Sequence, residues 1–518
     1  LEAVEKEIDI YAKKYPQHNE VYLWLAEIYI ANDDTEKAIE LFNKIIAKGD
    51  NDKNSLDART SLAQINFIKG DKESAKKAAD SVLEISPNNT QALFIQAAIA
   101  ADVGDYKTAI ADLRKIIHSE PKEKKAYKLL SEVFLMQGHN DLAIETLNQL
   151  IDIDPTNSQS LVRLSQLYSL NGDNDHAIKI LNTVNEKDPN YAIGWENTAR
   201  LAIIMKDPAA MKLAIENLDK IEGQEILSIF LKGELASLTG KEMYAFSSYS
   251  KVIEADPSSP MAEHALYSLI KEHSKPDELQ MVIDYIATLK TDSPYVSTIL
   301  GECYIYLGKI DLAKTAFNKA IINNPKNQSP YIHLAKIYLN EKKNDEAIAI
   351  LKTASEEIPN DASASLIQAG IFLGLGQYDK SIEIYDSILK TNQKVNEAAN
   401  NMASIIADYR YTDPIMLEKA QRIAERFEDF KNPLFLDTLG WVYYRQGKFD
   451  KALKIIERSI EINPKASQEI HYHYGVILLE EGDIAKAKEE LLLATEENAN
   501  YATLDEAKKL LKKITISE

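Results

Sequence analysis

A fixed spacing of 34 residues runs through most of the chain and constrains its fold more than any other feature. Three residue types recur at this spacing: Pro87, Pro121, Pro155 and Pro189; Gly70, Gly104, Gly138 and Gly172; Ala75, Ala109, Ala143 and Ala177. The proline series continues at Pro257, Pro325 and Pro359, in steps of 68, 68 and 34 residues. Self-similarity at a fixed period of this length indicates a repeat protein, in which each unit packs on its neighbours.

Each unit has the pattern of two amphipathic helices joined by a short turn. In 328–361, apolar residues recur at helical spacing in two runs, Ile332 to Leu339 and Ala347 to Ala354. Glycine in the turn permits the left-handed conformation that ends a helix without a Cβ clash. Proline closes the unit because it cannot continue a helix. A small residue eight positions into the unit, such as Ala97 or Ser131, lets two helices approach closely.

The stretch from Phe435 to Pro464 carries the fullest set of these markers. They are Leu436, Leu439, Gly440, Tyr443, Gly447, Ala452 and Pro464. Their spacing resembles the tetratricopeptide repeat (TPR) family, and the resemblance covers nearly the whole chain. It implies an all-α fold, a right-handed superhelical solenoid of about fourteen helix-turn-helix units with a concave groove.

The repeat pattern also predicts where the solenoid begins and ends. Residues 1–18 read as a second helix alone, so we expect the chain to start in mid-repeat, after further sequence upstream. The solenoid is expected over 19–499, and 500–518 are expected to form a single capping helix with a polar outer face.

Within the solenoid, three regions depart from the standard unit. The degenerate units 192–225 and 260–293 keep the length of a repeat but lose its markers. Five residues are inserted between the two helices of the unit at 396–432, and we expect this insertion to form a loop within 408–417. Inserted loops of repeat proteins often carry binding residues.

Charge and composition exclude several classes of function. With 80 acidic and 60 basic residues the net charge is -20, so the surface repels phosphate backbones. We therefore expect protein or peptide partners and no nucleic acid. The single cysteine, Cys303, excludes an internal disulfide and a cysteine-based zinc site. The apolar runs are far shorter than the roughly 18 residues needed to cross a bilayer, so no membrane insertion of this segment is expected.

The sequence contains no constellation that indicates chemistry, and we predict a non-enzymatic chain without catalytic, metal or cofactor sites. The run Gly374 to Gly376 lacks the third glycine and the preceding strand of a nucleotide-binding loop. His471 and His473 stand two residues apart, so on a helix their rings point about 200° apart and cannot share one metal ion. We expect them at the surface or partly in the core.

The family resemblance supplies candidate binding residues. In TPR proteins the second, fifth, ninth and twelfth positions of each first helix line the groove, which here places aromatic residues among carboxylates such as Glu234 and Glu302. With two tyrosines of the insertion, the candidates for partner binding are Trp441, Tyr444, Asp437, Tyr409, Tyr411, Phe230, Tyr295, Phe94 and Phe67. Such a groove suits an extended or helical peptide with apolar and basic side chains. Whether the groove or the insertion carries the binding stays open.

The C-terminal third also resembles large bacterial TPR proteins of the exopolysaccharide and envelope-assembly type, through stretches such as "LDTLGWVYYRQGKFDKAL" from Leu436 to Leu453. This implies a scaffold in the periplasm or tethered to the inner membrane, with the cytoplasm as the alternative. Our first hypothesis is thus a non-catalytic scaffold that binds peptide or protein partners in the concave groove, in a bacterial envelope or exopolysaccharide-export assembly. The alternative is the recruiting arm of a longer enzyme whose catalytic domain lies outside these residues.

Overall fold

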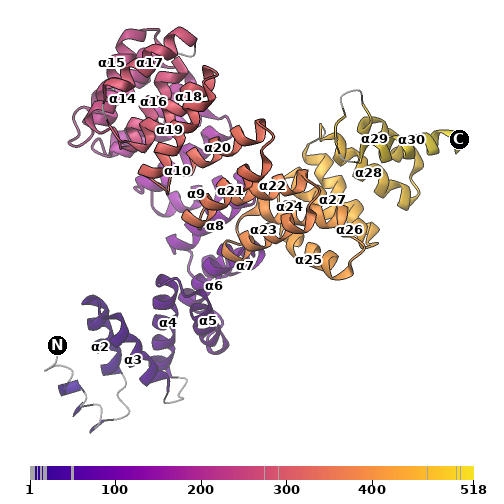
Figure 1. Ribbon diagram of the computed structural model, residues 1–518. Helices are drawn as coiled ribbons and strands as arrows, with labels where there is room; N and C mark the ends of the chain where they lie inside the picture. The colour runs from indigo at the N-terminus through magenta and orange to yellow at the C-terminus, as the bar shows by residue number, and fades with distance from the viewer. Residues whose placement is uncertain are drawn as a thin grey trace. The chain divides into compact units, whose positions relative to one another are not determined.

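The computed structural model describes residues 6–8, 10–11, 14–15, 20–47, 52–272, 275–289, 291–463, 465–496, 499–501 and 503–517. In these ranges every regular element is helical, which confirms the all-α prediction (Figure 1). Most of 1–18, predicted to be the end of an upstream repeat, lies outside the described residues, as does Pro464. The chain divides into two compact units, 1–153 and 154–518, and each is described by itself.

The described part of the first unit consists of four helix hairpins. They are α2 Glu20–Ala31 with α3 Thr35–Ile46, α4 Lys53–Ile68 with α5 Lys72–Ile85, α6 Thr90–Asp102 with α7 Tyr106–Ser119, and α8 Lys124–Met136 with α9 Asn140–Ile153. The two helices of each hairpin pack on each other, and direct contacts also join α2 to α4, α4 to α6 and α6 to α8.

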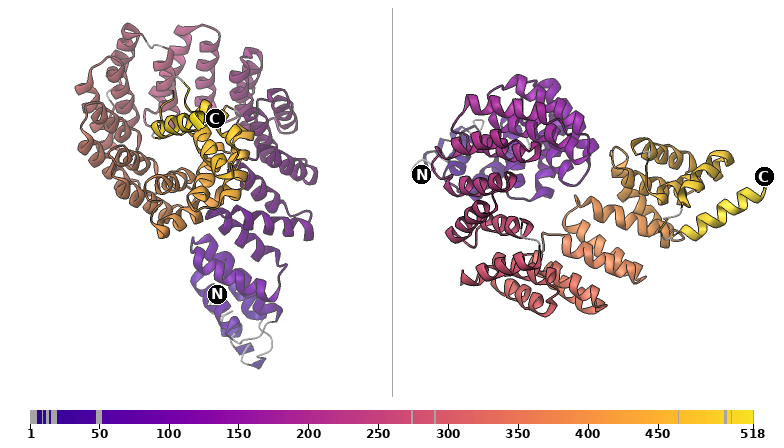
Figure 2. Two further views of the ribbon diagram at one scale, coloured as in Figure 1. Left: turned by 90° about the vertical axis from the view of Figure 1, so that its right-hand side faces the viewer. Right: turned by 90° about the horizontal axis from the view of Figure 1, so that it is seen from above.

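The described part of the second unit consists of ten hairpins and a final helix, shown from two further sides in Figure 2. They are α10 Ser158–Leu170 with α11 Asn174–Lys187, α12 Ala192–Met205 with α13 Pro208–Leu218, α14 Glu225–Leu238 with α15 Glu242–Ala255, α16 Pro260–Glu272 with α17 Pro276–Thr288, α18 Pro294–Tyr306 with α19 Ile310–Asn323, α20 Ser329–Asn340 with α21 Asn344–Glu357, α22 Ser363–Gly374 with α23 Tyr378–Thr391, α24 Asn396–Tyr409 with α25 Pro414–Ala424 and the 3-10 turn η1 Glu425–Phe427, α26 Pro433–Arg445 with α27 Phe449–Ile462, α28 Gln468–Glu481 with α29 Ile484–Ala494, and α30 Leu504–Ser517. The degenerate stretches 192–225 and 260–293 therefore fold as hairpins too, and α30 lies in the segment predicted to cap the solenoid.

Contacts between successive first helices are not uniform along the second unit. Direct packing joins the first helices from α10 to α18, and again α24, α26 and α28. From α18 to α24 the first helices have little direct contact, and the intervening second helices α19, α21 and α23 connect them.

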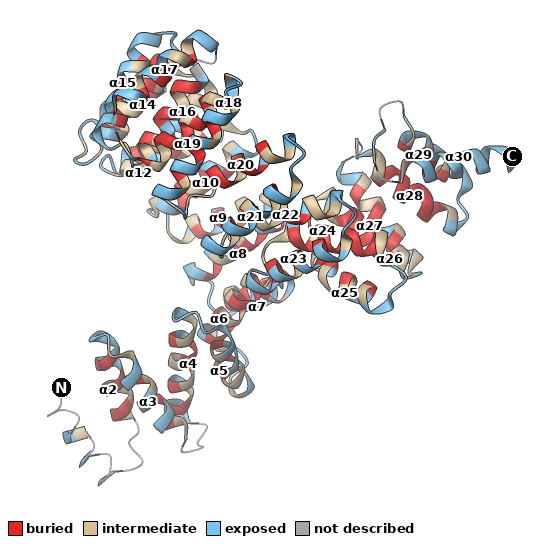
Figure 3. Ribbon diagram, in the orientation of Figure 1, coloured by how far each residue is buried: buried red, intermediate tan, exposed pale blue. Residues whose placement is uncertain are grey.

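The small-residue position of each unit is where the two helices of a hairpin meet. Ala97 and Ala335 at this position are 0% and 1% exposed, and buried residues line the seams between helices in Figure 3. Where the position is Gly301, an added Cβ would lie 2.5 Å from the ring of Phe317. The larger partner side chain thus occupies the space that a smaller residue leaves, as close packing of a core requires.

The turn between the two helices needs a residue in the left-handed conformation. Gly138 and Gly447 have φ angles of 76° and 70°. Three units without glycine use the same conformation at Asp33, Lys206 and Lys342, with φ angles of 64°, 53° and 60°. The hairpin geometry therefore imposes this conformation even on residues that pay a steric penalty for it.

The prolines do more than end the second helix. An aromatic residue near the start of the following first helix donates a hydrogen bond to the carbonyl of the proline six residues before it. These bonds join Tyr127 to Pro121 at 3.1 Å, Trp195 to Pro189 at 2.9 Å, and Tyr331 to Pro325 at 3.1 Å. They give the polar tip of a largely buried aromatic ring a partner and fix the link between hairpins.

The insertion predicted as a loop within 408–417 is mostly helical. Helix α24 continues to Tyr409 and α25 begins at Pro414, so only residues 410–413 form the turn. Asp413 caps α25 by accepting from the backbone N–H groups of Ile415 and Met416, at 2.9 and 3.2 Å. Proline is favoured at the first helical position, where its missing N–H is not needed. The loop therefore lies within 408–417 but is shorter than that range, and Tyr409, expected on the loop, is the last residue of α24.

Candidate functional site

Trp441, the first of the predicted binding residues, lies inside a buried cluster formed by α24, α26 and α28. Its side chain is 2% exposed, and its indole N–H donates to Asp408 Oδ1 at 2.8 Å. Its ring stacks on His473 and Tyr444, with centroid distances of 4.0 and 4.7 Å. The guanidinium of Arg445 lies 4.4 Å from the Trp441 ring centroid, a cation–π contact that covers the indole further.

Charged groups from the same helices complete this cluster. His473 Nδ1 lies 2.8 Å from Asp437 Oδ1, and the two residues are 5% and 8% exposed. Burial alone lowers the pKa of His473, but the charge and hydrogen bond of Asp437, with further charge from Asp408 and Glu469, raise that pKa overall. Burial raises the pKa of the Asp408 and Glu469 carboxyls. We call Asp408, Asp437, Trp441, Arg445, Glu469 and His473 the aromatic–ionic cluster.

This arrangement differs from the open aromatic face expected around Trp441. Trp441 and Asp437 are both in the core, so neither offers much surface to a partner. Tyr444 is half-buried against the indole, and Tyr411 is 42% exposed with the Arg445 guanidinium 4.1 Å from its ring centroid. The sequence pattern placed these residues on one helix face but could not show that the neighbouring hairpins cover Trp441.

The remaining candidates lie elsewhere. Tyr409 stacks on Tyr378 of α23 at 3.9 Å, and Phe230 on α14 packs edge-on against His264 of α16 at 6.4 Å. Tyr295 is half-buried on α18. Phe67 on α4 and Phe94 on α6 are half-buried in the first unit. The structure therefore brings Trp441, Tyr444, Asp437 and Tyr411 into one region, with Tyr409 directly after Asp408 on α24, and leaves the other candidates apart. The role of all of them in partner binding stays a prediction.

The two histidines of α28 point to different neighbours, as their spacing predicted. His471 Nδ1 lies 2.6 Å from Glu490 Oε2 on α29, whereas His473 contacts Asp437 on α26. Both histidines are buried, at 6% and 5% exposed, so the expected partial surface position is wrong. In the described residues, no group of three or more His, Cys, Asp or Glu side chains is arranged to hold a metal ion. None of the described helices is both long and apolar enough to cross a membrane.

An open cavity of about 510 Å³ lies between α18 and α20, where successive first helices have little direct contact. Its apolar wall consists of Ile305, Ile310 and Ile337. Tyr306, 69% exposed, stands at its edge. Its polar lining is Glu302, Asp311, His333, Lys336, Asn340 and Glu341. The cavity therefore combines an exposed aromatic ring with apolar and charged groups.

Glu302 is held in a defined position inside this cavity. Its side chain is 13% exposed, and its Oε1 accepts from the Tyr267 hydroxyl at 3.0 Å. His333 Nε2 lies 3.0 Å from the same oxygen, and the imidazole stacks on Phe317 with a centroid distance of 5.0 Å. Sequence analysis counted Glu302 among the groove carboxylates, but it missed His333, which stands at a position that the family pattern does not assign to the groove.

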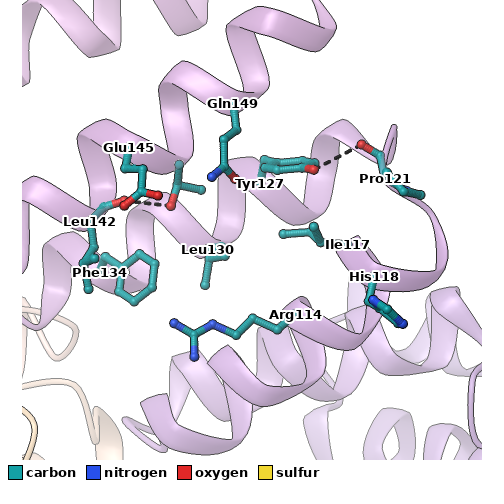
Figure 4. Close-up of a pocket in the computed structure, with 11 residues that line it drawn as sticks. Arg114, Ile117, His118, Pro121, Tyr127, Leu130, Phe134, Leu142, Glu145 and Gln149 are labelled. Carbon is teal, nitrogen blue, oxygen red and sulfur yellow. Dashed lines mark hydrogen bonds between the residues drawn. The ribbon is translucent and has the colours of Figure 1, made fainter.

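A second cavity, of about 450 Å³, lies in the first unit between α7 and α9, with α8 as its floor (Figure 4). Tyr127, Leu130 and Phe134 of α8 line the floor, and Arg114 and Glu145 lie on the opposite flanking helices. Figure 4 also shows the Tyr127 hydroxyl directed to the Pro121 carbonyl. The floor residues are the packing residues of the repeat, so this cavity follows from the spacing of the second helices.

Three curated relatives share part of the chain. Identity is 28% over 183 residues with BBSome complex member BBS4 of Bos taurus, which is 35% of this chain and 34% of that protein. It is 26% over 220 residues with anaphase-promoting complex subunit 3 of Schizosaccharomyces pombe, 42% of this chain and 32% of that protein. It is 24% over 263 residues with cellulose synthase operon protein C of Pseudomonas fluorescens, 47% of this chain and 20% of that protein. The chain thus spans about a third or less of the length of these relatives.

Family models give broader coverage. Models described as tetratricopeptide repeat match residues 10–65, 56–89, 100–159, 135–200, 304–371, 339–405 and 443–514. The matched stretches include the α20–α21 hairpin, the end of α18 with α19, and Arg445, Glu469 and His473 of the aromatic–ionic cluster. These matches cover more than half of the sequence and agree with the stacked helix hairpins. They show that the chain belongs to the tetratricopeptide repeat family.

Proposed function

We propose that this chain is a non-catalytic scaffold that binds protein partners on the first helices of its second unit, at the cavity between α18 and α20. Tetratricopeptide repeats are protein–protein interaction scaffolds, and such solenoids are typically non-catalytic. The observation that carries the proposal is the cavity itself, which places exposed Tyr306 beside an apolar wall and the fixed carboxylate of Glu302. Pockets that combine a rigid aromatic residue with a few placed polar groups are typical binding sites.

The finer part of the proposal concerns the assembly and the compartment. Two of the relatives are named as members of multiprotein complexes and a third as a cellulose synthase operon protein. We propose that this chain likewise serves in a multiprotein assembly, in a bacterial envelope or in exopolysaccharide export, on the periplasmic side or tethered to the inner membrane. Cell fractionation of the native protein, with periplasmic and cytoplasmic marker enzymes, tests the compartment. Recovery with the cytoplasmic marker would overturn it.

Site-specific photocrosslinking tests the binding face. A photoreactive amino acid replaces Tyr306 in the full chain, expressed in cells of the source organism. The control carries the same group at Ile322 on α19, which is 78% exposed and does not line the cavity. We expect a discrete adduct with a defined protein at position 306 and none at 322. Equal labelling at both positions, or none at 306, would contradict the proposal.

A further inference from the structure

The cavity between α18 and α20 contains a carboxylate oxygen that the protein itself leaves unused. Both hydrogen-bonding neighbours of Glu302, the Tyr267 hydroxyl and His333 Nε2, lie against Oε1. Oε2 has no hydrogen bond to any described residue. A carboxylate can accept four hydrogen bonds, so Glu302 retains acceptor capacity toward the cavity that it lines.

The carboxylate is also fixed before any ligand arrives. Phe317 is fully buried, and its ring lies almost parallel to that of His333, at an interplanar angle of 3°. His333 in turn contacts Glu302 from α20, while Tyr267 contacts it from α16. Three successive hairpins therefore hold one side chain, and a ligand that bonds to it loses little further entropy in ordering the site.

The electrostatic surroundings favour a cation. Burial raises the pKa of Glu263 on α16, and the negative charge of Glu302 adds to that rise although His264 opposes it. Asp311, at the first turn of α19, lines the same cavity. The charge of Glu341 is shared with Lys314 and Lys343. Lys336 is the one lysine of the described lining, but it is exposed, and its long flexible stem can move into solvent.

The apolar wall of the cavity indicates what kind of cationic group it can bind. Ile305, Ile310 and Ile337 come from three different helices and face one cavity of about 510 Å³, within the range of about 300–1,000 Å³ typical of ligand pockets. A basic side chain matches such a site, because its hydrocarbon stem packs on apolar surface while its charged head reaches a polar group. Arginine fits better than lysine, since its planar fork can donate to a carboxylate in a defined geometry.

We infer that the α18–α20 cavity binds an arginine side chain of the partner protein, with the guanidinium donating to Glu302 Oε2 and the stem packed on the three isoleucines. This inference rests on the proposed function, and it adds the chemistry of the segment that is recognised. Tyr306 at the edge would then lie beside the residues that flank the arginine, where an exposed aromatic ring can pack on the partner.

Two peptides test the inference. In the first, leucine alternates with arginine, and in the second, glutamate replaces arginine; both carry a fluorescein label. Binding to the full chain is measured by fluorescence anisotropy at about 0.15 M salt, where attraction between exposed, distant charges is largely screened. We expect binding of the arginine peptide and no measurable binding of the glutamate peptide.

Matched substitutions separate the cavity from the general acidity of the chain. Glu302→Gln is expected to weaken the arginine peptide about tenfold, because it removes a charge-assisted hydrogen bond. Lys336→Gln is expected to tighten it about twofold, because it removes a nearby like charge. Glu356→Gln and Lys352→Gln on α21, where both side chains are more than 60% exposed, make the same charge changes away from the cavity and should leave the affinity unchanged.

The two substitutions in the cavity, Glu302→Gln and Lys336→Gln, test the inference independently. Lys336→Gln changes an exposed side chain, so its result stands even if Glu302→Gln perturbs folding, which circular dichroism would reveal. Three results would overturn the inference: tighter binding of the glutamate peptide than of the arginine peptide, weaker binding of the arginine peptide by Lys336→Gln than by the unsubstituted chain, or equal losses of affinity in Glu302→Gln and Glu356→Gln. Crosslinking at position 306 to a segment without a basic residue would also overturn it, while leaving the proposed scaffold function intact.

Discussion

Replacing Asp437 with alanine is expected to destabilise the last hairpins of the second unit. Asp437 is 8% exposed, and its carboxylate lies 2.8 Å from the imidazole of His473, which is 5% exposed. Removing Asp437 takes away the hydrogen-bonding partner of a buried imidazole in a medium of low dielectric constant, and breaking such a buried charged pair costs about 3–5 kcal/mol. That is a large part of the roughly 5–15 kcal/mol by which folded domains are stable.

The loss should be local. In a repeat protein each hairpin contacts only its neighbours, so stability is approximately a sum of hairpin and interface contributions. Hydrogen exchange measured by mass spectrometry resolves such local opening. Because about 1.4 kcal/mol corresponds to a factor of ten, amides of α26 and α28 should exchange about 100- to 3,000-fold faster, while α10 keeps its protection.

Two further variants sharpen this test. Asp450→Ala on α27 removes an exposed carboxylate and should leave exchange in α28 nearly unchanged. The double variant Asp437→Ala with His473→Ala removes both charges, so it should be less destabilised than the sum of the two single variants. If Asp437→Ala accelerates exchange in α28 less than about tenfold relative to Asp450→Ala, the pair does not hold these hairpins together.

Three other outcomes follow from the same geometry. The folded-state pKa of His473 is raised, so the stabilisation from its charge is fully present below its ordinary pKa of 6.5 and is lost as pH rises through the raised value. Amides of α28 should therefore be better protected from hydrogen exchange at about pH 6 than at about pH 9, after correction for intrinsic exchange rates. The reverse trend would refute this. Gly301→Ala should lower the melting temperature, because its Cβ would lie 2.5 Å from Phe317 and overpacking costs about 1–3 kcal/mol, whereas Gly440→Ala, with its nearest neighbour at 3.5 Å, should raise it. Lys342→Gly should stabilise α20–α21 by roughly 1 kcal/mol by relieving the left-handed φ of 60°, and a lower midpoint in thermal denaturation would count against it.

Most of the fold could be predicted from the sequence, because a few residue types at fixed positions of the repeat determine the geometry of each hairpin. The period fixed the hairpins, the turn glycines and the small residues at the helix crossings, including Gly301 and Gly440. It could not show that Asp33, Lys206 and Lys342 adopt the glycine conformation, since propensity argues against them and only the packing of the hairpin enforces it.

The site was less predictable than the fold. Position within the repeat assigned Trp441 and Glu302 to the same helix face, but the surroundings differ. Around Trp441, direct packing of neighbouring first helices and the bond to Asp408 bury the ring. Around Glu302, the first helices separate and leave a cavity. The distance between neighbouring hairpins depends on long-range packing, which the pattern of a single repeat does not encode.

The uneven contacts along the first helices of the second unit also have a mechanical consequence. Between α24 and α28 direct packing and the aromatic–ionic cluster make a stiff segment, whereas α18, α20 and α22 are joined mainly through their second helices. When force is applied along the chain, bending should concentrate between α18 and α22, where the helices are less tightly joined. The α18–α20 cavity lies at the first of these soft joints. A partner side chain inserted there would add contacts between α18 and α20 and so resist bending at this position. Binding of the partner and bending of the helix stack would then be coupled, and each would change the free energy of the other by the same amount.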